Sequence, residues 1–158
     1  MLILTKLSRY EFEKLRHADH NEQQLERALR KRGSDYNMLL YHHTIHKKCE
    51  ALVTKTLEDY KIETKTIYRF DCNETNINWA DVLITTGGDG TFLLGASRIH
   101  SPNKPIIGFN SDPTRSEGYL CLPKKYSLEI KDAFNKLYKV ISDCTQNLFC
   151  QLSKCWLF

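Results

Sequence analysis

Near the middle of the chain stands Val82-Leu83-Ile84-Thr85-Thr86, followed directly by Gly87-Gly88-Asp89-Gly90-Thr91. The first five residues are apolar or β-branched without interruption, which is typical of a central parallel strand covered on both faces. The next residues predict a glycine-rich loop, and residues 91–99 predict a helix. A buried strand, a tight loop and a helix in this order favour an α/β fold.

The segments on either side alternate in the same way. We predict further strands over residues 2–7, 62–68 and 105–109, and further helices over residues 11–31, 44–60 and 127–141. The helix over residues 44–60 rests on an apolar stripe at helical spacing, formed by Ile45, Cys49, Leu52, Val53, Leu57 and Tyr60. The order predicts an open, three-layer α/β architecture with a mostly parallel sheet. Ligands of such sheets bind beyond the carboxyl ends of the strands, so the loops after Thr86 and Phe109 are the candidate site.

The length and composition exclude several classes of protein. A chain of 158 residues fits one domain, and seven Gly plus four Pro are too few for a disordered or fibrous chain. Its short apolar runs exclude a membrane span, which needs roughly 20 apolar residues. The net charge of +4 suits a phosphate-bearing ligand without indicating nucleic-acid binding. The N-terminus predicts a strand rather than a signal peptide, so the six Cys, which form no Cys-x-x-Cys pair, are predicted to be reduced thiols.

The loop after Thr86 has the properties of a phosphate-binding site. Its glycines can adopt positive φ and let the backbone approach a ligand closely. The first amides of the following helix are unpaired donors at the positive end of the helix dipole. Asp89 could then deprotonate an attacking hydroxyl or help to hold a metal. The alternative is that Asp89 or Thr91 only caps the helix.

The loop after Phe109 carries a second group of polar residues. Asn110 could bind ribose hydroxyls, Arg115 could contact a phosphate, and Asp112 or Glu117 could bind a hydroxyl or a cation. The alternative is that Asn110-Ser111-Asp112-Pro113 forms a turn held by its own side chains. Because this loop follows a strand expected next to the first one, we predict that the two loops form one cleft.

Residues 42–49 also contain possible metal ligands. His42, His43, His46 and Cys49 could be presented on one helix, but they lack the order of a metal site. We interpret the histidines as exposed and Cys49 as part of the core, and we assign no metal ligands. Lys124 and Lys125 could steer an anionic ligand or form a solvated pair.

Several of these stretches are similar to a known family. Residues 86–94 resemble the GGDGT signature of NAD kinases, which diacylglycerol and sphingosine kinases and phosphofructokinases share more loosely. Residues 104–113 and 115–123 resemble the mitochondrial NAD kinase branch of animals, as do residues 7–13 and 79–81. The resemblance covers roughly residues 2–139.

The resemblance implies ATP-dependent phosphorylation of the adenosine-ribose 2′-hydroxyl of NAD, which gives NADP. It implies that Asp89 is the catalytic base and that Mg²⁺ accompanies ATP. The nucleotide-binding residues it implies are Gly87, Gly88, Gly90, Thr91, Asn110 and Asp112. It further implies a mitochondrial location, with the cytoplasm as the alternative, and a homo-oligomer, such as a dimer, for the full-length family. No nucleic-acid or membrane partner is expected.

The resemblance also divides the chain. We predict a nucleotide-binding α/β domain over residues 1–139 and a divergent tail, without a match to the family, over residues 140–158. The family's second, all-β domain, which supplies much of the NAD site, is not recognised in this sequence, so we expect little or no kinase activity from this chain alone. The alternatives are a lipid kinase of the diacylglycerol or sphingosine type and a non-catalytic regulator that pairs with a complete enzyme.

Overall fold

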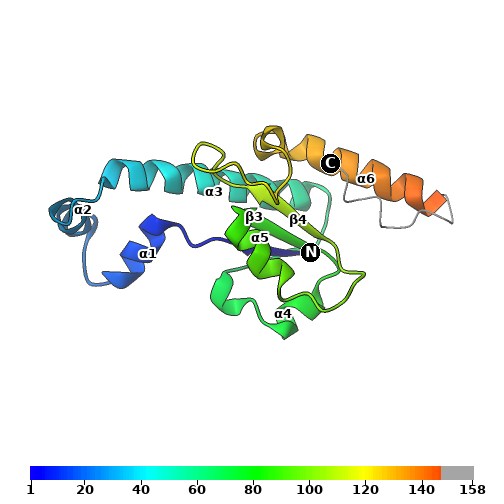
Figure 1. The fold of residues 1–158 in the computed structure, drawn as a ribbon, viewed down its shortest axis with the longest axis horizontal. Helices are drawn as coiled ribbons and strands as arrows, with labels where there is room; N and C mark the ends of the chain where they lie inside the picture. Colours follow the sequence, from blue (N-terminus) through cyan, green and yellow to red (C-terminus); the bar gives the residue numbers. More distant parts are fainter. Residues whose placement is uncertain (147–158) are drawn as a thin grey trace.

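A computed structural model describes residues 1–146 as a parallel sheet between layers of helices (Figure 1). The strands are β1 (Leu2–Thr5), β2 (Lys65–Ile67), β3 (Leu83–Gly87) and β4 (Ile106–Asn110). The helices are α1 (Arg9–Arg16), α2 (Glu22–Lys31), α3 (Tyr36–Asp59), α4 (Glu74–Trp79), α5 (Asp89–Ala96) and α6 (Ile130–Gln146). Short 3-10 turns lie at Arg69–Asp71 and Lys124–Ser127. The predicted α/β class is confirmed.

The sheet has the strand order β2-β1-β3-β4, and every pair in it is parallel. After β1 the chain crosses through α1, α2 and α3 to β2 on one side. After β3 it crosses through α5 to β4 on the other side. The connections therefore diverge between β1 and β3, which is where open sheets of this kind bind their ligands.

Two apolar cores lie on the two faces of the sheet. Ile3, Ile84 and Phe109 pack with residues of α3 and α6 on one face. Leu2, Leu4 and Leu83 pack with residues of α4 and with residues near α5 on the other. Neighbouring strand residues thus point to opposite faces, as the pleat requires. Figure 1 shows α3 and α6 on one side of the sheet and α4 and α5 on the other.

A third cluster lies beyond the sheet, where α1 and α2 pack on the beginning of α3. Its buried members are Tyr10, Leu25, Leu29 and Tyr36. The prediction of one continuous helix over residues 11–31 was wrong, because α1 ends at Arg16 and α2 begins at Glu22. Asn21 starts α2 by accepting a hydrogen bond from the Gln24 amide, while the Gln24 side chain bonds back to the Asn21 amide. This reciprocal cap favours a new helix start over continuation.

Helix α3 begins at Tyr36, two turns before the predicted start at residue 44. Asp35 caps it by accepting a hydrogen bond from the Met38 amide. The buried face is also shifted from the predicted stripe. His46, interpreted above as exposed, is fully buried, whereas Leu52 and Tyr60 are partly exposed.

The remaining differences concern short segments. Helix α4 was not predicted; Asn73 caps its first turn, and Lys104 donates to the carbonyls of Ile77 and Ala80 at its end. The predicted tail begins inside α6, and its part from residue 147 lies outside the described residues. Cys49, Cys72 and Cys121 are free thiols. In the part of the chain described, no helix combines the length and the apolar character that crossing a bilayer demands.

Candidate functional site

A cavity of about 540 Å³ opens where the connections diverge, at the carboxyl ends of the strands. Its walls come from the segments that follow β1, β2 and β3. The lining residues are Thr5, Lys6, Leu7, Arg9, Phe12, Arg69, Phe70, Gly88, Gly90, Thr91 and Leu94. The volume falls within the range of roughly 300–1,000 Å³ that is usual for small-molecule sites.

The glycine-rich loop forms one wall of this cavity. Gly88 is the N-cap of α5, with extended backbone angles, and the Thr91 amide bonds to the Gly88 carbonyl. Positive φ, expected above for these glycines, does not occur in the loop; among the described glycines it occurs at Gly33 and Gly118. Of the three loop glycines, Gly87 is the one whose position leaves no room for a side chain. A Cβ on Gly87 would lie 2.2 Å from Thr91 Oγ1, whereas Gly90 has no atom within 4 Å of such a Cβ.

Asp89 lies at the first position of α5, but it does not line the cavity. Its carboxylate turns toward the loop after β4. Oδ1 accepts a hydrogen bond of 2.8 Å from the Leu120 amide, and Oδ2 accepts one of 3.2 Å from the Tyr119 amide. Gly118, at φ 68°, makes the turn that presents these two amides. The structure thus holds Asp89 in one orientation between the two predicted loops.

Asn110 and Asp112 lie beside this turn and are almost fully buried. The Asn110 amide donates to the Ser116 carbonyl, and its oxygen accepts from the Asp112 amide. The Asp112 carboxylate bonds to His42 Nδ1 at 2.8 Å and accepts from Thr114 Oγ1 at 2.6 Å. Both side chains therefore shape the loop in this structure. Their assignment to nucleotide binding stays a prediction.

The loops after β3 and β4 lie side by side, as predicted, and one cleft between them stays a prediction. Asn110 pairs with Gly87 across the sheet, and the two loops are in contact there. The larger cavity lies on the other side of β3, toward β1. Of the predicted residues, Gly88, Gly90 and Thr91 line it, whereas Arg115 lies in a smaller neighbouring cavity. Glu117 forms an exposed ion pair with Lys124 instead.

Sequence analysis missed the contributions of Lys6, Arg9, Arg69 and Phe70. The predicted first strand, residues 2–7, includes Lys6, whereas β1 ends at Thr5. The guanidinium groups of Arg9 and Arg69 lie over the Phe12 and Phe70 rings, about 5.5 Å and 5.7 Å from the ring centres. The signal that could have found Lys6 and Arg9 is the strand order. Once β1 is the neighbour of β3, Lys6 and Arg9 after β1 must face the glycine loop; Arg69 and Phe70 follow β2, one strand further away, and this signal does not find them.

No group of three or more His, Cys, Asp and Glu side chains in residues 1–146 is arranged to hold a metal ion. His46, considered above as a possible ligand, has a different role. Its Nε2 lies 3.0 Å from the Lys6 carbonyl, which can only accept, so Nε2 carries the hydrogen. Thr5 and Glu50 complete a small buried network beside it. His46 thus ties α3 to the segment that lines the cavity.

We expect this buried histidine to make the protein's stability depend on pH. Burial lowers the pKa of His46 to about 4, against 6.5 for an ordinary histidine. Below pH 6.5 the histidine of the unfolded chain is protonated while that of the folded chain stays neutral. The free energy of unfolding therefore decreases as the pH is lowered. Between pH 7 and pH 5 the loss from this group is about 2 kcal/mol. Urea unfolding across this range should show that His46→Gln flattens the profile, while His100→Gln at an exposed position should not. An equal slope in both variants would contradict the assignment.

Comparisons with known proteins show which family the chain belongs to. A family model described as the ATP-NAD kinase N-terminal domain matches residues 12–143. The chain belongs to the NAD kinase family. It is 40% identical over 141 residues to "NAD kinase 2, mitochondrial" of Homo sapiens, a match that covers 88% of this chain and 32% of the human protein. It is also 41% identical over 138 residues to the protein of that name in Rattus norvegicus, which covers 86% of this chain and 32% of the rat protein.

More distant relatives carry similar names. The chain is 36% identical over 92 residues to "NADH kinase" of Arabidopsis thaliana, which covers 49% of this chain and 28% of the plant protein. The chain thus spans about a third of the length of these relatives. Since the family model and the relatives are all NAD or NADH kinases, the comparisons favour this family over a lipid kinase.

Proposed function

We propose that this chain forms the nucleotide-binding part of an NAD kinase, which transfers a phosphoryl group from ATP to the 2′-hydroxyl of the adenosine ribose of NAD. The observation that carries the proposal is the Gly87–Thr91 loop. It connects a buried parallel strand to a helix at the edge of a nucleotide-sized cavity, in a chain of this family.

ATP is the ligand we assign to the 540 Å³ cavity. The Thr91 amide bonds to the Gly88 carbonyl, but the Asp89 and Gly90 amides before it lie ahead of the helical hydrogen bonds of α5 and suit phosphate oxygens. Lys6 and Arg9 supply positive charge on the opposite wall. At the rim, the Phe12 and Phe70 side chains are 44% and 80% exposed, and such aromatic faces suit a nucleotide base.

Asp89 is the residue to which we assign the proton transfer. In the proposed reaction its carboxylate accepts the proton of the ribose 2′-hydroxyl while that oxygen attacks the terminal phosphorus of ATP and ADP departs. The two amide hydrogen bonds orient the carboxylate for this role, and each oxygen keeps a lone pair. A Mg²⁺ ion that accompanies ATP would be held mainly by the phosphate oxygens and water and would supply positive charge that neutralises the phosphates, which leaves Asp89 free to act as the base.

Because the chain spans about a third of the length of its relatives, the test compares it with a chimera that contains the remainder of one of them. The chain alone should bind ATP in calorimetry but form little or no NADP, because the resemblance places much of the NAD site in a second domain. A chimera that joins residues 1–139 to the remainder of the human relative should form NADP from NAD and ATP.

In that chimera, Asp89→Asn should lower kcat by about 10²–10⁴-fold, as expected on loss of a general base. Its ATP affinity should change little. Asp81→Asn, at an exposed position before β3, is the matched control and should retain full activity. Phosphorylation of diacylglycerol in place of NAD, or a fully active Asp89→Asn variant, would contradict the proposal.

Two other expectations of the resemblance stand as proposals. The human and rat relatives are named mitochondrial, which supports a mitochondrial location for the natural protein. Fractionation of cells that produce the protein tests its location, and recovery in the cytosol alone would refute the proposal.

Self-association as a dimer is tested by analytical ultracentrifugation. A monomer at all concentrations would contradict a dimer.

A further inference from the structure

A second cavity, of about 120 Å³, lies on the other side of the segment that follows β1. Lys6 and Arg9 contribute to both cavities. The other walls of the second one come from α3, through His42 and His43, and from Arg115 in the loop after β4. No residue of the Gly87–Thr91 loop lines it. It is thus a neighbouring space, separate from the wall where the glycine loop would bind phosphates.

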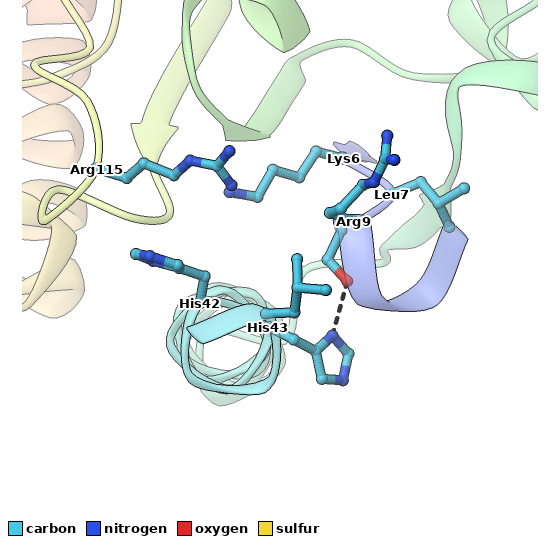
Figure 2. Close-up of a pocket in the computed structure, with 8 residues that line it drawn as sticks. Lys6, Leu7, Arg9, His42, His43 and Arg115 are labelled. Carbon is cyan, nitrogen blue, oxygen red and sulfur yellow. Dashed lines mark hydrogen bonds between the residues drawn. The ribbon is translucent and has the colours of Figure 1, made fainter. Parts of the chain in front are cut away.

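Two cations face each other across this second cavity. Figure 2 shows the side chains of Lys6 and Arg115 extending toward one another from opposite sides. Within residues 1–146, neither the Lys6 ammonium nor the Arg115 guanidinium has a hydrogen bond or ion pair to an acidic group. Two unpaired cations in one small space repel each other, and an anion between them would remove that cost.

Asp112 is the acidic residue beside these two cations, but it does not neutralise their charge. The Asp112 carboxylate already accepts from Thr114 and is bonded to His42, and it is almost fully buried. Burial lowers the pKa of Lys6; Asp112 opposes this effect and Arg115 adds to it. Burial and Arg115 both act against the charged form of Lys6, and an anion beside the ammonium would raise its pKa again.

We infer that Lys6 and Arg115 form a binding site for a phosphate group. Arginine presents a planar fork that matches phosphate oxygens, and lysine adds a compact charge, a combination that suits a tetrahedral anion. The volume is below the roughly 300 Å³ typical of sites for whole small molecules, so it suits one phosphate group rather than a nucleotide. The phosphate would belong to a nucleotide whose remainder occupies the larger cavity, and in this respect the inference rests on the proposed function.

Inorganic pyrophosphate tests the site without a nucleotide. We expect calorimetry to show binding to the unmodified chain, and Lys6→Met and Arg115→Met each to lower the affinity by about tenfold. Lys55→Met and Arg27→Met remove the same charges at exposed positions on α3 and α2 and should leave the affinity within about twofold. Affinities that fall equally in all four variants, or in none, would overturn the inference.

Two further measurements separate the outcomes. Thermal unfolding identifies any variant that fails to fold. Arg115→Lys keeps the charge but loses the planar fork of the guanidinium, so it should bind pyrophosphate with intermediate affinity.

If Lys6→Met and Arg115→Met weaken ATP binding in parallel, the phosphate comes from the nucleotide. If they weaken pyrophosphate binding alone, the site stands as one for a free anion. Pyrophosphate binding that depends on both residues in a chain that does not bind ATP would refute the proposed function and leave the phosphate site standing.

Discussion

Gly118→Ala is expected to lower the free energy of unfolding by about 3 kcal/mol. A residue with a side chain pays about 1–2 kcal/mol for the left-handed backbone that Gly118 adopts at φ 68°. The added Cβ would also lie 2.6 Å from Asn110 Nδ2 and 2.9 Å from Asn110 Cβ. Asn110 is buried and bonded at both ends of its amide, so it cannot turn away without losing those bonds. Urea unfolding measures the loss.

The chain contains a matched control for the steric part of this effect. Gly33 follows α2 with φ 79°, but a Cβ there would meet no atom within 4 Å. Gly33→Ala should therefore cost only the backbone term, about 1–2 kcal/mol. Amide hydrogen exchange at Tyr119 and Leu120 should accelerate in Gly118→Ala alone, because these amides hold Asp89. If the free energy of unfolding fell equally in the two variants, the contact of the new Cβ with Asn110 would contribute nothing to the loss.

Gly87→Ala is expected to distort the glycine loop and to weaken ATP binding by more than tenfold. The new Cβ would lie 2.2 Å from Thr91 Oγ1 and 2.6 Å from Thr91 Cβ. Because the Cβ of Thr91 is fixed to the helix backbone, rotating the side chain does not remove the clash, and the first turn of α5 must move. We expect a loss of about 2–4 kcal/mol in unfolding free energy, within the range for overpacked buried positions.

Gly90→Ala is the control for this prediction. A Cβ at Gly90 meets nothing, and alanine favours a helix over glycine by up to about 1 kcal/mol, so this variant should be as stable as the unmodified chain or more so. Gly90 lines the cavity, so the added methyl group should still lower the affinity of the Gly90→Ala variant for ATP. Adding Thr91→Gly to Gly87→Ala should restore part of the lost stability. If Gly87→Ala were as stable as Gly90→Ala, the close packing of Thr91 on Gly87 would be refuted.

Local patterns predicted where the strands lie and most of α3 and α6, because residue type and spacing along the chain indicate these elements. The apolar run before Gly87 marked a central parallel strand, and the structure confirms it. The errors came where local signals were weak or where tertiary contacts override them. Residues 17–21 separate α1 from α2, and Asn21 caps the start of α2. The good helix formers on both sides made this break hard to predict. His46 is buried because α3 packs against the end of β1, a contact that the spacing of apolar residues does not reveal.

The position of the glycine loop between a strand and a helix could be predicted from the sequence, because the buried strand, the loop and the helix start are consecutive along the chain. The side of β3 on which the cavity opens depends on strand order, and strand order is a pairing between distant segments. The same holds for the amides that orient Asp89, for the bond between His42 and Asp112, and for the meeting of Lys6 with Arg115. These contacts join residues that are far apart in sequence, so they exist only once the sheet has brought the ends of its strands to one edge.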